Sequence, residues 1–317
     1  MITIKRYTPE QRQAWNVFVA QSRQGTFLFD RNYMDYHQDR FHDHSLMLFY
    51  KDKLYALLPA NEVDVPERVI YSHQGLTYGG LITCNKMTTE LTCEVFQIIG
   101  NYLKAQGFKK MIYKAIPWIY HKIPSEEDLY ALIQIGKARL CAREISTTIP
   151  LCHPLRFSEQ RRRGIQKARK QGLTIKICQL EEVKAFWNIL NNNLYYKYHT
   201  HPVHTIAELQ LLMGRFPQNI IGYVVMQEEE VIAGCIVFIT PQVIHTQYIA
   251  ASEKGKAIGA LDYLFNFIIN IEKWNVPYID FGKSTEEQGT YLNANLIHQK
   301  EGFGGRGMVY DTYEWEL

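Results

Sequence analysis

The stretch from residue 244 to residue 305 constrains the fold most, because strand-like and helix-like patterns alternate along it. Ile244–Ala251 is predicted to be a strand, and a charged segment with two glycines follows it. An apolar helix is expected over Leu261–Trp274, with a second strand over Tyr278–Phe281. A β–α–β order with a glycine-bearing loop before the helix is how several folds hold a phosphorylated ligand.

A fainter copy of this order occupies the first half of the chain, where a helix is expected over Val95–Ala105. Trp15 and Trp187 hold equivalent places in the opening helix of each half, and the offset of about 170 positions recurs later in the chain. This agreement indicates two copies of one α/β unit, although chance recurrence of amphipathic elements is the alternative. The predicted domains are residues 1–153 and 154–317, with a cleft between them.

Local signals also recur in the same order in both halves. Capping boxes are predicted at Thr8–Gln11 and Thr205–Glu208, and Asp30 is a candidate cap for a second helix. A hairpin is expected from Leu46–Tyr50 and Leu54–Leu58, and another from residues 221–226 and 231–239. A further strand is expected at residues 110–114.

Composition limits the class of protein. At 317 residues the chain is long enough for two domains, and a net charge of only +3 argues against a protein that coats nucleic acid. The six cysteines have no CxxC pairing, and no apolar run reaches the ~18 residues of a membrane span. We therefore expect reduced thiols, no membrane span and a cytoplasmic location; the oligomeric state stays open.

The charged segment before the second-half helix is a candidate anion site. Gly255 and Gly259 permit close backbone approach, and Lys254 and Lys256 add positive charge, which is suited to a pyrophosphate. A solvated turn that needs glycine only for its backbone angles is the alternative. The histidines at 199, 201 and 204 lack a matching cysteine pair or acid cluster, so we predict no metal site.

A basic helix is predicted over Arg161–Leu173. Arg162, Arg163, Lys167 and Arg169 spread positive charge over a broad arc of it. That arc is suited to phosphates of an RNA end, a nucleotide-sugar or a cofactor. A solvated helix that covers a domain joint is the alternative.

Several motifs, taken in order, resemble the FemABX-type branch of the GNAT superfamily. The basic helix is similar to the one that opens that family's second domain, and Tyr78-Gly79-Gly80 is similar to a first-domain motif. Ile279-Asp280-Phe281-Gly282 and the terminal Lys300-Glu301-Gly302-Phe303-Gly304 resemble the end of the second domain. The terminal motif departs from the family's Phe-Lys-x-x-Phe-Gly pattern because it lacks the first aromatic residue.

The resemblance implies an α/β (α+β) chain with two GNAT-like domains, each a mixed, mostly antiparallel sheet flanked by helices. It also implies an acyl- or aminoacyltransferase with no tightly bound cofactor, using acyl-CoA or aminoacyl-tRNA as co-substrate. The acetyl-CoA loop of single-domain GNAT proteins survives only in degenerate form at residues 256–261, which leaves the donor open. The implied acceptor is an amine, of a peptidoglycan-precursor peptide or of a small molecule, and tRNA is a candidate partner.

Acyl transfer to an amine requires a group that removes the amine proton and donors for the developing oxyanion. The candidates are Tyr248, Asp280 and Lys300, the last placed near the transfer centre by the resemblance. Tyr78 and the basic arc are the candidate substrate contacts. The alternative for each of these side chains is a structural role. The alternative for the whole chain is a ligand-binding protein without catalytic activity.

Overall fold

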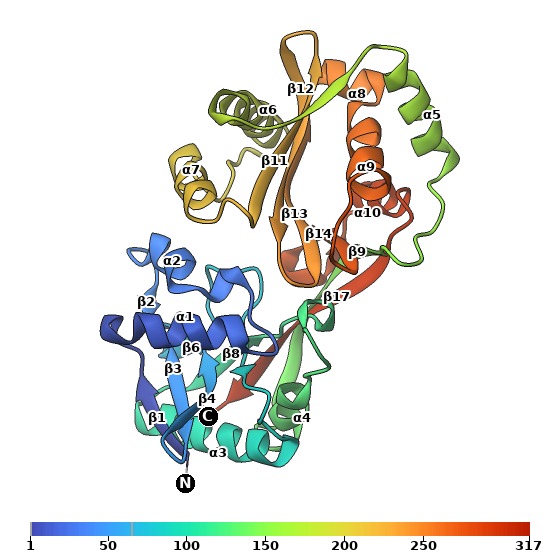
Figure 1. Cartoon of the computed structure of the whole chain (residues 1–317). Coiled ribbons are helices and arrows are strands. Elements are labelled where there is room, and N and C mark those ends of the chain that lie inside the picture. The colour runs from blue at the N-terminus through green and yellow to red at the C-terminus, as the bar shows by residue number, and fades with distance from the viewer. Residues whose placement is uncertain (1, 65) are drawn as a thin grey trace. The chain divides into compact units, whose positions relative to one another are not determined.

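The structure, a computed structural model, describes residues 2–64 and 66–317. It divides into two compact units (Figure 1). The first contains residues 1–144, 285–291 and 309–317, and the second contains residues 145–284 and 292–308. The boundary predicted from the sequence lies between residues 153 and 154, whereas the boundary in the structure lies between residues 144 and 145. In addition, residues 285–291 and 309–317 belong to the first unit.

The first unit holds two groups of strands. One has the order β1 (Ile2–Arg6), β3 (Leu46–Tyr50), β4 (Lys53–Leu58) and β7 (Ile82–Thr83). The other has the order β17 (Arg306–Glu316), β8 (Lys110–Lys114), β6 (Val69–Tyr71), β5 (Asn61–Val63) and β2 (His42–Asp43). The helices are α1 (Arg12–Gln21), α2 (Arg31–Met34), α3 (Thr89–Ala105) and α4 (Glu127–Gln134).

The second unit is built on one run of strands. Its order is β10 (Thr174–Ile177), β11 (Ile220–Gln227), β12 (Glu230–Ile239), β13 (Val243–Ala251), β14 (Tyr278–Lys283) and β9 (Arg139–Pro150). The helices are α5 (Glu159–Arg169), α6 (Leu180–Tyr198), α7 (Ile206–Arg215), α8 (Glu253–Ile258), α9 (Ala260–Asn270) and α10 (Ala294–Glu301). A short pair, β15 (Thr285–Glu286) and β16 (Tyr291–Leu292), precedes α10.

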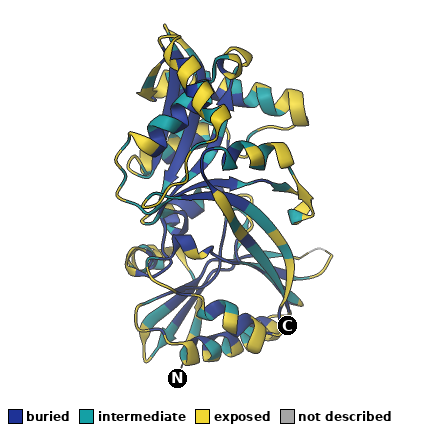
Figure 2. Cartoon of the chain, turned by 90° about the vertical axis from the view of Figure 1, so that its right-hand side faces the viewer, coloured by how far each residue is buried: buried dark blue, intermediate teal, exposed yellow. Residues whose placement is uncertain are grey.

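Helices cover both faces of this sheet. Phe186 of α6 packs where a side chain at Gly234 would stand, and Phe265 of α9 belongs to the core cluster on the sheet's other side. Figure 1 shows α6 and α9 on opposite sides of β11–β13. In both units the buried residues concentrate on the strands and the inner faces of the helices (Figure 2). This pattern is expected when apolar area is removed from water on two faces of a sheet.

The local predictions are largely confirmed. Both capping boxes form, Asp30 accepts a hydrogen bond from the Asn32 backbone N–H, and both hairpins have the predicted strands. The mixed, mostly antiparallel sheets are confirmed too. In each unit one parallel pair is joined through a long helix: β6–β8 through α3, and β13–β14 through α9.

Two expectations about the second-half helix need correction. It ends at Asn270 rather than Trp274. The segment before it is not an open loop, because residues 253–258 form the short helix α8, capped by Ser252 and ended by Gly259 at φ 79°. In the described part of the chain, no helix is both long and apolar enough to cross a membrane.

Candidate active site

The site begins where two neighbouring strands separate. β13 and β14 pair only from Val243 to His245 on one strand and from Tyr278 to Asp280 on the other. Beyond that point, among the described residues, β13 has a strand partner only in β12. The edge of β13 from residue 246 to residue 251 is therefore open.

Backbone groups of β13 point to this open edge. The Ser252 N–H donates to the Ile232 carbonyl at 2.9 Å, and alternate residues of an antiparallel pair direct both backbone groups to the partner strand. The N–H and C=O groups of Ile249 and Ala251 consequently point away from β12. Asn193 reaches the same edge, since its Nδ2 donates to the Ala251 carbonyl at 2.9 Å.

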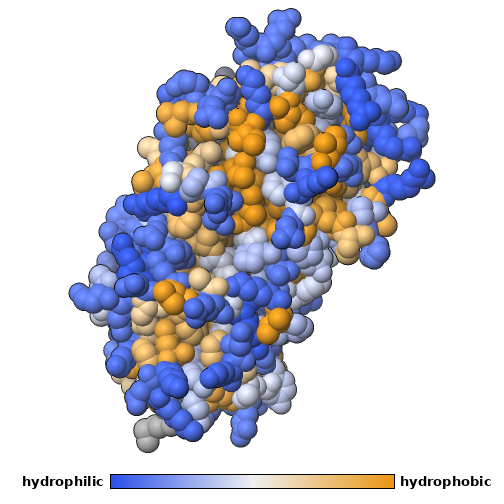
Figure 3. Space-filling view, in the orientation of Figure 1, coloured by the Kyte–Doolittle hydropathy of each residue, from blue (hydrophilic) through white to orange (hydrophobic). Residues whose placement is uncertain are grey.

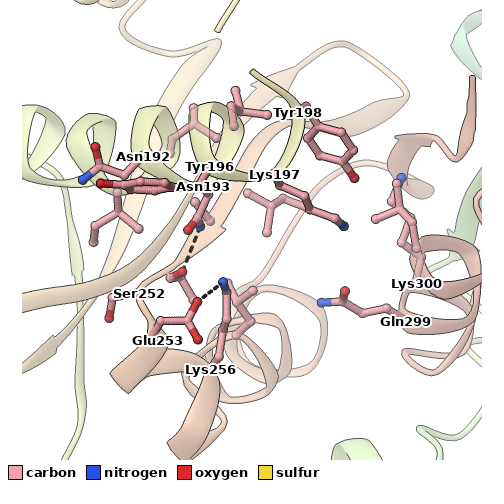
Figure 4. Close-up of a pocket in the computed structure, with 18 of the residues that line it drawn as sticks. Asn192, Asn193, Tyr196, Lys197, Tyr198, Ser252, Glu253, Lys256, Gln299 and Lys300 are labelled. Carbon is pink, nitrogen blue, oxygen red and sulfur yellow. Dashed lines mark hydrogen bonds and ion pairs between the residues drawn. The ribbon is translucent and has the colours of Figure 1, made fainter. Parts of the chain in front are cut away.

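A pocket of about 870 Å³ occupies the space beside this edge. Every lining residue belongs to the second unit. Hydrophobic side chains are visible on the surface between α6 and α9 (Figure 3), and apolar atoms dominate the wall. The polar and aromatic polar residues of the wall are Asn192, Asn193, Tyr196, Lys197, Tyr198, Ser252, Glu253, Lys256, Gln299 and Lys300 (Figure 4).

These polar side chains come from three places in the chain. The C-terminal half of α6 supplies one group, the start of α8 a second and α10 the third. Figure 4 shows Lys197, Lys256 and Gln299 extending toward one another across the pocket. An apolar wall with a few convergent polar groups is typical of a small-molecule site.

Lys300 is the buried cation of this pocket. Only 6% of the residue is exposed, and its Nζ donates to the carbonyl oxygens of Gly282 and Lys283, both at 2.8 Å. Burial lowers the pKa of Lys300 to about 8, and nearby Asp280 opposes that shift. An ammonium has three N–H donors, so one remains for a third partner.

The terminal motif separates into side chains with different surroundings. Lys300 and Phe303 both line the pocket, and Phe303 also packs against the rings of Phe157, Phe265 and Phe281. Gly304 has φ 88° and lies so close to the Leu155 carbonyl that a side chain would collide with it. The motif therefore anchors α10 and fixes the direction from which Lys300 enters the pocket.

Asp280 does not line the pocket. It is fully buried, and it accepts hydrogen bonds from Ser146, from Thr148 at 3.2 Å and from the Gly282 N–H at 3.3 Å. His245 Nδ1 lies 3.1 Å from its other oxygen. Since a buried carboxylate needs such partners, these contacts satisfy both oxygens of Asp280 outside the pocket.

Tyr248 also lies outside the pocket wall. Its hydroxyl contacts His204 Nδ1, and the ring of Trp187 packs edge-on against it. Burial raises the pKa of Tyr248 to about 12. The structure thus brings only Lys300 of the three predicted catalytic residues to the pocket.

The predicted anion-binding segment forms the helix α8 and not a loop. Lys254 pairs with Glu230 and Lys256 with Glu253, each at 2.6 Å. Gly255 packs against β12, where a side chain would stand 2.3 Å from the Ile232 carbonyl. Gly255, Lys256 and Gly259 line a second pocket of about 300 Å³, which shares Lys256, Leu261 and Gln299 with the larger one.

The basic helix borders this smaller pocket through Arg161 and Gln160. The Arg161 side chain is largely buried and pairs with Asp262 at 2.6 Å. The four predicted phosphate contacts line neither pocket and are exposed: Arg162, Arg163, Lys167 and Arg169. Arg163 pairs with Glu159 one turn away.

Tyr78 is a core residue of the first unit. Only 1% of it is exposed, its ring packs against Phe29 and Tyr120, and its hydroxyl lies 3.4 Å from Thr26 Oγ1. His204 contacts Tyr248 and His201 contacts Asn191. Within residues 2–64 and 66–317, no group of three or more histidine, cysteine or acidic side chains is arranged to hold a metal.

Sequence reasoning missed most of the polar lining. Asn193 carries no motif, and Ser252, Glu253 and Gln299 adjoin the charged segment and the terminal motif without being predicted as site residues. Tyr196 and Tyr198 had a weak signal, because a tyrosine-rich helix end is a candidate pocket wall. These residues line the pocket because of where the end of α6 and the start of α8 lie in the fold.

Solved structures with the same fold give this geometry a context. FemX aligns with 99% of this chain and 97% of its own, at a TM-score of 0.70 and 10% identity. The C-terminal domain of a putative lysylphosphatidylglycerol synthetase from Agrobacterium fabrum aligns with 96% of this chain and 91% of its own (TM-score 0.60, 11% identity). A tandem GNAT protein from the clavulanic acid biosynthesis pathway covers 100% of this chain and 98% of its own (TM-score 0.50, 7% identity).

The chain therefore has a tandem GNAT-like fold of the FemX type, as the resemblance implies. No protein-family model matches the sequence, and no curated protein matches it at a significant level. At these identities the likeness concerns the fold.

Proposed function

We propose that the chain is an acyltransferase, which moves an acyl or aminoacyl group from an activated carrier in the second-unit pocket to an amine. The observation that carries the proposal is the pocket at the point where β13 and β14 separate, with buried Lys300 in its wall. An extended carrier arm with amide groups would lie along the open edge of β13 and exchange backbone-type hydrogen bonds with Ile249 and Ala251.

In this proposal Lys300 stabilises the charge that develops during transfer. Two of its N–H donors hold the carbonyl groups of Gly282 and Lys283. The third would donate to the acyl carbonyl oxygen as it becomes an oxyanion. The amine nitrogen forms the new C–N bond, the bond from carbonyl carbon to carrier breaks, and the amine proton leaves with the released carrier.

An acyl-CoA thioester is the donor that the pocket favours. The larger pocket would hold a slender arm, and Lys256, which lines both pockets, would contact phosphates. The acceptor we propose is an amine of a peptidoglycan-precursor peptide, as the resemblance to FemABX-type proteins implies. The alternative acceptor is a small amine.

Lys254 and Lys256 provide a matched pair for testing this donor. Both are half-exposed on α8 and both form an ion pair, but only Lys256 lines the pockets. Lys256→Glu should weaken CoA binding by about tenfold, measured by calorimetry, and Lys254→Glu should not. Equal losses in both variants, or no CoA binding to the unaltered protein, would exclude CoA as donor.

A turnover assay then tests the chemistry. Release of free CoA thiol is followed with acetyl-CoA and a panel of amines, and Lys300→Met should lower kcat by about 10²–10³-fold, as expected for loss of an oxyanion donor. CoA binding to Lys300→Met should persist. A variant that keeps full turnover would remove Lys300 from the mechanism.

The exposed helix α5 favours aminoacyl-tRNA as the second candidate donor. Among the described residues, Arg162, Lys167 and Arg169 form no ion pair, so their charge is available to a polyanion. Changing these three to Glu should abolish deacylation of aminoacyl-tRNA by the acceptor while leaving CoA binding intact. Absence of acceptor-dependent deacylation in the unaltered protein would reject this donor.

A further inference from the structure

Strand β14 contains a bulge just beyond the point where it separates from β13. Asp280 and Lys283 of β14 pair with Thr148 and Ser146 of β9, so β14 uses one residue more than β9 over this distance. Gly282 lies within the bulge and has φ 71°. A bulge bends its strand and redirects the backbone groups near it.

This bulge turns two consecutive carbonyl groups toward one side chain. The carbonyl oxygens of Gly282 and Lys283 both accept from Lys300 Nζ at 2.8 Å. In a regular strand, consecutive carbonyl groups point in opposite directions, so this double contact depends on the bulge. A neutral amine has two N–H groups, whereas an ammonium has three. Because the two carbonyl groups occupy two of them, only charged Lys300 has a donor left for a ligand.

The carboxylate of Asp280 holds the bulge in place. One of its oxygens accepts from the Gly282 N–H at 3.3 Å, from Thr148 at 3.2 Å and from the Ser146 hydroxyl. The other oxygen lies 3.1 Å from His245 Nδ1. Asp280 is fully buried, and its contacts join the bulge to β9 on one side and to β13 on the other.

Gly282 is required for the same arrangement. Its backbone is in the left-handed region, which glycine adopts without strain. A side chain at this position would stand 3.1 Å from Cε1 of His245. Any larger residue would therefore shift the bulge, and the two carbonyl groups would move with it.

Asp280 also acts on Lys300 through its charge. Burial lowers the pKa of Lys300, and the negative charge of Asp280 opposes that change. The other charged or titratable side chains on the surrounding elements α6, α8, α10, β13 and β14 are Lys197, Glu253, Lys256, His298, Glu301, His245 and Lys283. Of these, Glu253 is paired with Lys256.

We propose that Asp280 is a positioning residue for acyl transfer, because it fixes the bulge whose two carbonyl groups hold Lys300 and leave its third N–H for the acyl oxygen. This inference rests on the proposed role of Lys300 as oxyanion donor. Asp280 does not line the pocket, so it acts through the bulge and through its charge. Unlike a purely structural carboxylate, it should change the state of Lys300 when it is replaced.

The titration of Lys300 tests the effect of the Asp280 charge. The ¹³Cε resonance of Lys300 is followed against pH by NMR in the full-length protein with isotope-labelled lysine, and Lys300→Met identifies it. Asp280→Asn removes the negative charge but keeps an oxygen that can accept from the Gly282 N–H. The midpoint of the Lys300 titration should therefore fall by about one pH unit. An unchanged midpoint overturns the proposal.

Gly282→Ala tests the bulge without a change of charge, and it covers the case in which Asp280→Asn fails to fold. The Nζ protons of Lys300 should exchange with water about tenfold faster or more in this variant, measured by ¹H–¹⁵N NMR at about pH 6. Gly172 is the matched control, because it has φ 67° and a side chain there would meet nothing within 4 Å. Gly172→Ala should change the rate by less than about twofold. Equal rates in the two variants overturn the role of the bulge.

A kinetic measurement connects this positioning with the transfer reaction. If the third N–H of Lys300 is the oxyanion donor, kcat/KM for acetyl-CoA should fall as Lys300 loses its proton. The alkaline limb of the pH profile should then move to lower pH in Asp280→Asn, by the same amount as the NMR midpoint. A limb that stays in place while the midpoint moves overturns a role for Asp280 in the reaction. Absence of turnover in the unaltered protein removes the proposed function alone, since the NMR measurements decide by themselves whether Asp280 and the bulge position Lys300.

Discussion

At the scale of single residues, burial decides what a lysine can do. Lys254, Lys256 and Lys300 all occur near glycines in the sequence. The first two keep half of their side chains exposed and pair with glutamates, whereas Lys300 is buried against two carbonyl groups. Desolvation lowers the pKa of Lys300 to about 8. This side chain can therefore change its charge near neutral pH.

Lys300 should make a contribution to stability that rises with pH. Its pKa is about 8 in the folded protein and ordinary, about 10.4, in the unfolded chain. Between those values Lys300 binds more protons in the unfolded chain, so its contribution to the free energy of unfolding increases as pH rises from about 8 to 10.5, by up to about 3 kcal/mol. Urea unfolding at pH 8 and pH 10 measures this slope.

Lys300→Met is the control for that slope. The variant lacks the titrating group, so its free energy of unfolding should increase less between pH 8 and pH 10 than that of the unaltered protein. An identical increase in the two proteins would show that another group is responsible.

At the scale of elements, helix α8 differs most from a sequence-based expectation. Local chemistry specifies its ends, since Ser252 caps it by accepting from the Gly255 N–H at 3.1 Å, and Gly259 ends it. Packing specifies its interior, because Gly255 brings the helix backbone against β12. The glycine thus serves contact between helix and strand rather than an open loop.

Gly255→Ala should therefore destabilise the protein. The added methyl group would stand 2.3 Å from the Ile232 carbonyl, and the helix must move away from β12, at a cost of about 1–3 kcal/mol. The thermal midpoint and the free energy of unfolding in urea measure the loss.

Gly214 is the matched control within a helix. It lies in α7, and a side chain there would meet nothing within 4 Å. Gly214→Ala should stabilise the protein by about 0.5–1 kcal/mol, since alanine loses less conformational entropy on folding. If both alanine variants shift stability in the same direction, packing of α8 on β12 is not the cause.

At the scale of the whole molecule, β9 and β17 each contribute residues to both compact units. The C-terminal segment 309–317 completes the first unit, where Trp315 is buried in the core. Gly100 and Gly136 both lie against its ring, and Phe96 packs on it with centroids 5.7 Å apart. The core of the first unit is therefore built partly from the end of the chain.

A fragment of residues 1–153 should consequently fail to fold by itself. It contains the predicted first domain but lacks β17 and Trp315, so a large part of its core is open to water. We expect poor dispersion of its amide resonances by NMR. A cooperative thermal transition for this fragment would show that the first unit does not need residues 309–317.

Trp315→Ala in the full chain tests the same point more gently. Removal of this side chain should lower the free energy of unfolding by about 3–5 kcal/mol. Tyr291, which is exposed, is the control, and Tyr291→Ala should change the same free energy by less than about 0.5 kcal/mol. Similar losses in the two variants would contradict the assignment of Trp315 to the core.

The sequence by itself determined the features that depend on near neighbours. The capping boxes at Thr8 and Thr205, the hairpin turns and the amphipathic helices follow from interactions within a few residues, which any close reading can find. The order of these elements, with the terminal motif around Lys300, was enough to predict a tandem GNAT-like fold.

Only the tertiary structure decided which side chains share a site. The packed interior contains Tyr78, Tyr248 and Asp280. The pocket wall contains Asn193 and Gln299 together with Lys300. Which side chains line the pocket depends on where β13 and β14 separate. It also depends on which lysines form ion pairs with carboxylates. Those contacts join residues tens to hundreds of positions apart, and no local pattern encodes them.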